Sequence, residues 1–198
     1  MTASTDFATG TVVTADWLNA VNSYVFDLSV SVKAHGAIGD GITDDTTAIQ
    51  AAIDEAAEYP VCNVLFPPGN YRTTATLTMP SSAGRNFALI GQGYAAYGSV
   101  LSGVILTADH TAGPVVRLSS SGQRVESMVI SASTARTAGA RDSNFGILVE
   151  PPDSSGATIA GACLRNVTIA GQPFHGVVTS GTIFLCDFEG VAVQNNKG

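Results

Sequence analysis

The sequence predicts an all-β solenoid, in which short strands stack turn upon turn around one core. The first observation is its composition, with 45% hydrophobic residues, 13% charged residues and 21 glycines, which is typical of a β-rich chain with many turns. The second is a repeat, because similar apolar segments begin at Pro114, Gly146 and Gly176, 32 and 30 residues apart. The third is that this region lacks helical periodicity, which argues against a βαβ fold.

A second segment follows the start of each repeat. Residues 125–130, 164–169 and 188–193 share the pattern apolar–x–small–apolar–x–apolar. The spacing predicts a bend at the small residue and then a strand. The segments are constant while the gaps before them vary in length, as expected of a solenoid whose insertions fall in loops.

Strands are also predicted before the repeats. Residues 61–66 form an apolar strand, and 67–70 form a turn rich in proline and glycine. Residues 71–79 alternate in polarity, which predicts one strand with a single solvated face. Residues 87–91 and 103–107 are further strands.

Residues 31–56 predict a strand, a tight glycine turn and an amphipathic helix. Asp44 suits the N-cap position, and Asp45 then lies where the helix dipole favours an anion. Small apolar residues form one stripe of this helix, which lets it lie close to a flat surface: Ala48, Ile49, Ala52, Ile53 and Ala56. We assign turn and cap roles to Gly36, Gly39, Asp40, Gly41, Asp44 and Asp45.

This stretch and two later ones resemble the start of the pectate-lyase-like right-handed β-helix family, as found in bacteriophage tailspikes and tail fibres. The matching elements, in the family's order, are Gly36–Gly41, Asp44–Gln50, Val64–Tyr71 and Phe87–Gly93. The resemblance implies a right-handed parallel β-helix with an N-terminal capping helix, assembled as a homotrimer. It places the β-helix domain at residues 31–198.

Residues 1–30 are expected to form a short arm and a helix. Thr14 suits the N-cap of a helix that runs to residue 28. One face carries a short heptad-like seam, with members Trp17, Leu18, Val21, Val25 and Leu28. This helix either packs on its own β-domain, or trimerises or docks onto another tail, baseplate or adaptor protein of the virion. Residues 12–19 also resemble the start of several phage tail-fibre proteins.

The charge pattern argues against several other functions. The formal net charge is −7 and no basic stripe occurs, which argues against nucleic-acid binding. No apolar run reaches the ~18 residues of a membrane span. The first residues lack the features of a secretory signal, so we expect synthesis in the host cytoplasm and a place in the virion.

No cofactor and no metal are expected from the cysteine and histidine pattern. The three cysteines are too scattered for a disulfide framework or a zinc site, and the three histidines share no ligand spacing. Asp40, Asp44 and Asp45 could serve glycoside hydrolysis or bind calcium, but turn and cap geometry accounts for all three.

Asp187 and Glu189 are the best candidate catalytic pair. They flank Phe188, so both carboxylates point outward if Phe188 points into the core. The chain ends at Asn195–Gly198 without an amphipathic cap, so we expect it to continue past Gly198, or a partner to cover this end.

Two functions follow as expectations. The first is a structural phage tail fibre or tailspike, in which this portion anchors the appendage and begins a β-helical host-recognition shaft. The alternative is a polysaccharide depolymerase, a glycoside hydrolase or lyase that acts on host surface glycans. We expect this portion to be non-catalytic, and a polysaccharide lyase or glycoside hydrolase if it is an enzyme.

Overall fold

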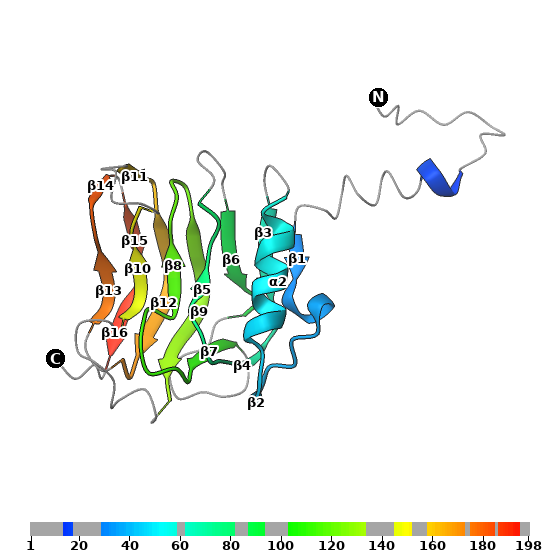
Figure 1. Ribbon diagram of the computed structural model, residues 1–198, viewed down its shortest axis with the longest axis horizontal. Coiled ribbons are helices and arrows are strands. Elements are labelled where there is room, and N and C mark those ends of the chain that lie inside the picture. The colour runs from blue at the N-terminus through cyan, green and yellow to red at the C-terminus, as the bar shows by residue number, and fades with distance from the viewer. Residues whose placement is uncertain are drawn as a thin grey trace.

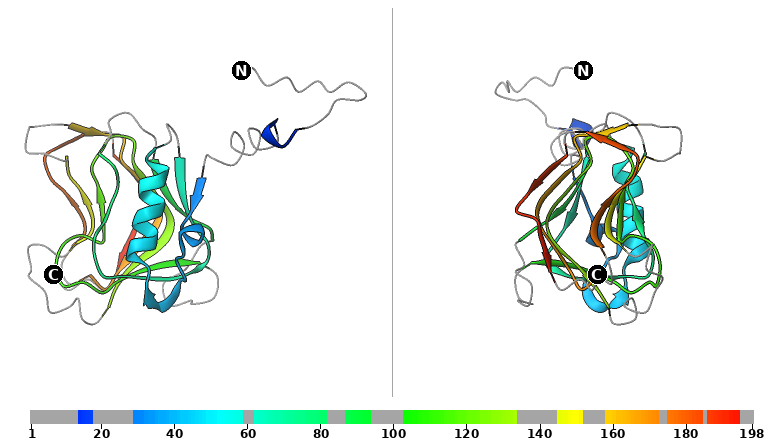
Figure 2. Two further views of the ribbon diagram at one scale, coloured as in Figure 1. Left: turned by 45° about the vertical axis from the view of Figure 1, so that its right-hand side comes forward. Right: turned by 90° about the vertical axis from the view of Figure 1, so that its left-hand side faces the viewer.

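The computed structural model describes residues 14–17, 29–58, 62–81, 87–93, 103–133, 145–151, 158–172, 175–184 and 186–194. Within these residues the chain forms a right-handed parallel β-helix, which confirms the predicted fold class. In every strand pair of the described residues, the two strands run parallel. Viewed along the stack, the strands surround a common interior (Figure 2, right).

The strands lie on three faces. The first face holds β1 (Ser29–Ser31), β3 (Cys62–Phe66), β6 (Phe87–Gly91), the first halves of β9 (Arg124–Ala132) and β12 (Cys163–Ala170), and β15 (Asp187–Glu189). The second holds β2 (Asp40–Asp44), β4 (Gly69–Thr73), β7 (Val104–Ala108), the second halves of β9 and β12, and β16 (Ala192–Gln194). The third holds β5 (Leu77–Thr78), β8 (Val116–Leu118), β10 (Phe145–Val149) and β13 (His175–Thr179). Beside these faces, β11 (Thr158–Ala160) pairs with β14 (Thr182–Phe184).

At the bend between the first face and the second, one residue adopts the left-handed backbone conformation. Ser127 in β9 has φ 57° and Asn166 in β12 has φ 52°, and Gly190 between β15 and β16 has φ 62°. These are the small residues of the repeat pattern, so the predicted bends are confirmed. Side chains with a β-branch rarely adopt this conformation, whereas Asn and Gly tolerate it.

The core consists of columns of apolar side chains, one from each rung. On the first face the column is Val30, Val64, Leu89, Val125, Leu164 and Phe188. On the second it is Tyr71, Leu106, Ile130, Ile169 and Val193. All are buried except the last of each column, Phe188 and Val193. Each fully buried member contributes about 1.5–3 kcal/mol through the hydrophobic effect.

Helix α2 (Thr46–Ala56) covers one end of this stack, and β15 and β16 lie at the other (Figure 1). Ile49, Ala52, Ile53 and Ala56 are fully buried beneath it, which agrees with the predicted apolar stripe. The helix begins later than predicted, and Asp45 rather than Asp44 occupies the N-cap position. The reason is that Asp44 is still the last residue of β2, which pairs with β4.

Three local predictions differ from the structure. Residues 32–35 form the 3-10 helix η1 (Val32–His35) and do not extend the preceding strand. Residues 71–79 are divided between β4 and β5 by a corner at residues 74–75, because they pass from the second face to the third. The first repeat is shifted by one residue, since Val116 and not Val115 pairs with Ile147. Both valines are fully buried, so polarity alone did not distinguish them.

Little of the predicted N-terminal helix lies within the described residues. Residues 15–17 are helical, and the amide of Trp17 donates to Thr14 Oγ1 at 3.2 Å, the bond expected of an N-cap. Leu18, Val21, Val25 and Leu28 lie outside the described residues. Among the helices of the described part, none has both the length and the apolar character needed to cross a membrane.

Candidate functional site

Two groups of acidic side chains are candidates for function, one beside the cap and one on the last rung. In the first, Asp45 is almost fully buried. Its carboxylate accepts hydrogen bonds from the amides of Ile38 at 2.7 Å and Gly39 at 3.0 Å. The side chain therefore folds the preceding loop back onto the start of α2, and both its oxygens are occupied.

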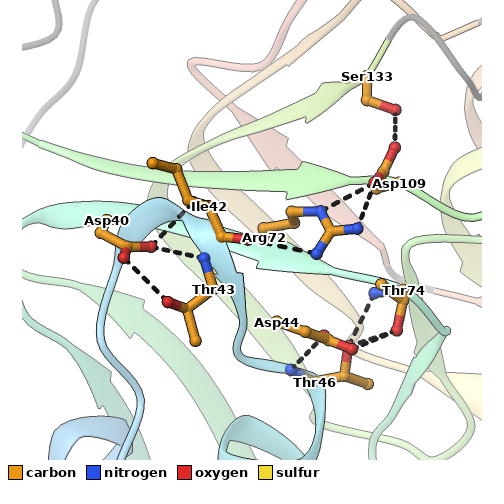
Figure 3. A network of polar contacts seen from close by, with 9 residues as sticks. All are labelled: Asp40, Ile42, Thr43, Asp44, Thr46, Arg72, Thr74, Asp109 and Ser133. Carbon is orange, nitrogen blue, oxygen red and sulfur yellow. Dashed lines mark hydrogen bonds and ion pairs between the residues drawn. The ribbon is translucent and has the colours of Figure 1, made fainter.

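Asp40 closes the next turn in the same way. Its carboxylate accepts from the amides of Thr43 at 2.7 Å and Ile42 at 2.8 Å, and from Thr43 Oγ1 at 2.9 Å (Figure 3). The hydrogen bond from the Thr43 amide, followed by that from Ile42, lowers the pKa of Asp40. The backbone at Gly39 has φ 69°, and a Cβ there would lie 2.9 Å from the ring of Tyr71.

Tyr71 packs against this turn at Gly39. The ring is fully buried, and its hydroxyl donates to the carbonyl of Pro67 at 2.7 Å. Burial, with a smaller effect from the charge of Asp45, raises the pKa of Tyr71 to about 12. This phenol is thus a neutral structural donor and not a general base.

Asp44 joins the cap to the following rung. Its carboxylate accepts from Thr46 Oγ1 at 2.5 Å and from Thr74 Oγ1 at 2.6 Å, with Thr74 lying beyond β4 (Figure 3). Partial burial raises the pKa of Asp44, but the hydrogen bonds from Thr46 and Thr74 outweigh it and lower the value overall.

An ion pair continues this network across the next rungs. Arg72 of β4 donates to Asp109 Oδ2 from Nε at 2.8 Å and from Nη2 at 2.6 Å, and to the carbonyl of Ile42 at 3.3 Å. Asp109 also accepts from the hydroxyl of Ser133 (Figure 3). The bond from Ser133, and then those from Arg72, lower the pKa of Asp109. Local sequence patterns do not reveal this pair, because its members are 37 residues apart.

The second group lies on β15 at the last rung. Arg165 of β12 pairs in register with Glu189, and its Nε lies 3.0 Å from Glu189 Oε2. Arg165 Nη2 lies 3.9 Å from Asp187 Oδ2. The two carboxylate side chains are 65% and 67% exposed. Asp187 and Glu189 therefore lie on either side of Phe188 on the outer surface and share one guanidinium.

Chemically this second group can bind hydroxyls or cations at the surface. Glycoside hydrolysis by a retaining or inverting mechanism places two carboxyl groups on opposite sides of the bond that breaks. Here both carboxylates meet the same guanidinium instead. The neighbouring thiol of Cys163 is buried, which raises its pKa and disfavours the nucleophilic thiolate.

No group of three or more His, Cys, Asp or Glu side chains in the described part of the chain is arranged to hold a metal ion. The acids beside the cap are instead occupied by amide, hydroxyl and guanidinium donors.

The fold and the cap define a β-helix of the pectate-lyase type. A family model, described as rhamnogalacturonase A/epimerase, pectate lyase-like, matches residues 29–149, more than half of the chain. The chain therefore belongs to this family. The match begins at β1 and ends at β10, so it spans the cap and the first complete rungs.

Several proteins are similar to this chain. The mannuronan C5-epimerase AlgE6 of Azotobacter vinelandii is 50% identical over 48 residues, which are 24% of this chain and 6% of the relative. The solved structure of its A-module has a TM-score of 0.60 at 23% identity, covering 84% of this chain and 49% of that one. A putative glycosyl hydrolase from Parabacteroides merdae has a TM-score of 0.57 at 17% identity, covering 86% and 75%.

A third similar protein is named for binding and not for an enzymatic activity. The plasmin and fibronectin-binding protein A of Streptococcus pneumoniae is 56% identical over 46 residues, which are 23% of this chain and 6% of the relative. Its structure, described as a surface adhesin, has a TM-score of 0.51 at 19% identity and covers 83% and 39%. The sequence match thus spans only a small part of either curated relative.

Proposed function

We propose that this chain is the anchoring, non-catalytic first part of a phage tail fibre or tailspike. Residues 1–30 attach it to the virion or bring three copies together, and the β-helix from residue 31 begins the shaft. The resemblance of Gly36–Gly93 to the start of phage tailspikes supports this role. Membership of the pectate lyase-like family supports a shaft that belongs to a polysaccharide-recognising protein.

The observation that carries the proposal is that the acids beside the cap accept hydrogen bonds from the chain itself. Asp40, Asp44, Asp45 and Asp109 each accept at least two hydrogen bonds from the chain itself. A catalytic carboxylate must have an oxygen free for the substrate or its proton. These four side chains are therefore best suited to holding the cap on the stack.

Trimer formation is the first test. A homotrimer has three times the 20.2 kDa mass of the chain, which light scattering after size exclusion measures directly. A charge within the N-terminal seam, as in Val21→Asp, should convert the trimer to monomer while the β-sheet circular dichroism is retained. A wild-type chain that is a stable monomer would contradict the trimer.

We place host recognition in later rungs or between subunits. A bacterial surface polysaccharide is the expected ligand, because relatives of this chain carry the names of polysaccharide-acting proteins. Immunogold labelling of purified virions with an antibody to this chain tests the location. Label on the tail is expected, and virions without label would contradict a virion role.

Polysaccharide processing is a second candidate function. Asp187, Glu189 and Arg165 favour it, because they form a compact charged group on the outer surface. The purified chain would be incubated with alginate and with capsular polysaccharides, and released reducing ends and uronate composition would be measured. Turnover that is abolished by Asp187→Asn with Glu189→Gln would replace the structural proposal with an enzymatic one.

A further inference from the structure

The outer edge of the third face is closed by a side chain of the cap helix. Beside β8, the amides of Leu77 and Met79 donate to carbonyls of the next rung at 2.9 and 3.0 Å. Successive residues of a strand direct their amide and carbonyl groups to opposite sides, so those of Thr78 point away from β8. This is the edge at which a further strand could pair with β5.

Gln50 of α2 occupies this edge in the way that a neighbouring strand would. Its Oε1 accepts from the amide of Thr78 at 3.0 Å, and its Nε2 donates to the carbonyl of Thr78 at 3.1 Å. Two residues that face each other in a hydrogen-bonded antiparallel pair exchange the same two bonds. Nε2 also donates to Asp54 Oδ1 at 2.9 Å, one helical turn further on, and this bond holds the carboxamide in its orientation.

Other side chains close the edge that leads from the second face to β5. Asp40 accepts from the amides of Ile42 and Thr43 in β2, at 2.8 and 2.7 Å (Figure 3). At the corner that follows β4, the amide of Thr74 donates to Thr46 Oγ1 at 2.8 Å. These amides are therefore already bound within the chain, as is the edge of β5.

We propose that Gln50 takes the place of a strand beside β5 and thereby closes the third face to pairing with a second copy of the chain. A strand from another copy would have to displace this carboxamide. It would exchange two neutral hydrogen bonds for two of the same kind, so the exchange gains little. A partner at the cap end therefore contacts side chains and not the sheet edge. The inference does not depend on the virion role or on the trimer of the proposed function.

Hydrogen exchange resolved to single residues is the first test, on the full chain. Gln50→Ala removes both bonds to Thr78, so the amide of Thr78 should exchange at least about tenfold faster than in wild type. The amides of Leu77 and Met79 should keep their rates, because their bonds lie on the other side of β5. Thr47→Ala, at an exposed position of the same helix, is the matched control and should leave all three rates unchanged.

Self-association is the second test. Gln50→Ala combined with Asp40→Ala frees the edge of β5 and two amides of β2. In sedimentation velocity this variant, and to a smaller degree Gln50→Ala alone, should form larger species whose share rises with protein concentration. Thr47→Ala should sediment as wild type does. Within the larger species the amide of Thr78 should exchange slowly again, because a strand of another copy then binds it.

Three results would each overturn the proposal. The first is an unchanged exchange rate at Thr78 in Gln50→Ala. The second is an equal increase at Leu77 and Met79, which would mean that Gln50 only stabilises the rung as a whole. The third is that both Gln50 variants sediment as wild type does at every concentration.

Discussion

The buried carboxylate of Asp45 makes the most stringent test of how the cap is held. Asp45→Asn keeps the shape of the side chain but replaces one acceptor oxygen by an NH₂ group. The amide oxygen can still accept from Ile38, the closer donor at 2.7 Å. The NH₂ group then faces the amide of Gly39, which donated to the second oxygen at 3.0 Å. One buried donor therefore loses its partner.

The expected cost follows from that one bond. A hydrogen bond to a charged group contributes about 1.5–3 kcal/mol, and leaving a buried donor unpaired forfeits it. For a chain of this size each kcal/mol corresponds to about 2–4 °C in the unfolding temperature. We expect Asp45→Asn to lower the thermal midpoint by about 3–12 °C. Asp45→Ala removes both acceptors and should cost about 3–6 kcal/mol.

Urea unfolding followed by circular dichroism measures this loss. The control is Asp54→Asn on the same helix, where an exposed carboxylate accepts from Gln50 Nε2 at 2.9 Å and an amide oxygen can replace it. That variant should stay within about 0.5 kcal/mol of wild type. Hydrogen exchange should be faster at Ile38 and Gly39 in Asp45→Asn. Equal unfolding free energies for the two variants would refute the role of Asp45.

Three further changes test other parts of the stack. Gly91→Ala should destabilise by about 1–3 kcal/mol or prevent folding, because its Cβ would lie 2.0 Å from the carbonyl oxygen of Ser127. Asn166→Ala should cost about 1–2 kcal/mol through its φ of 52°, whereas Asn166→Gly should cost less. Asp40 and Asp109 have lowered pKa values in the folded chain. Their carboxylates therefore stabilise the fold fully at pH values above the ordinary aspartate pKa of about 3.9. That contribution is lost as the pH falls through the lower folded-state pKa, and the thermal midpoint of Asp109→Asn should vary less with pH below 5 than that of wild type.

Each of these has a contrary outcome that denaturation curves would reveal. An alanine at residue 91 that leaves the urea midpoint unchanged would mean that the strands can move apart at the bend. Equal costs of alanine and glycine at residue 166 would mean that the backbone angle is not what selects asparagine. If the thermal midpoints of Asp109→Asn and wild type changed equally with pH, the ion pair between Asp109 and Arg72 would not stabilise the fold.

The register of the second repeat segment was predictable because a small residue or one that tolerates a left-handed backbone marks the bend. Ser127, Asn166 and Gly190 are small or tolerant of a left-handed backbone, and each lies two residues beyond an inward apolar side chain. That combination admits a single alignment. The third face offered no such marker, and two adjacent buried valines at 115 and 116 allowed a shift of one residue. In a strand such a shift exchanges the inner and outer faces.

The contacts between Arg72, Asp109 and Ser133 were not predictable in the same way. They depend on how many residues each rung contains and on where the chain turns between faces. Local signals in residues 40–46 indicate the turn and cap roles of the acids, but not their partners in other rungs. Asp44 shows the difference, since its short-range bond to Thr46 follows from spacing whereas its bond to Thr74 crosses 30 residues.

Inward and outward columns carry different information in this fold. An inward residue such as Leu164 must match Val125 on one side and Phe188 on the other, so its side chain reports packing. An outward charge reports what it contacts. Beside the cap that contact lies within the chain, as with Arg72 and Asp109. On β15 two carboxylates meet one guanidinium, that of Arg165 in the preceding rung. Outward charges of this solenoid therefore report contacts between rungs, which the local sequence pattern does not reveal.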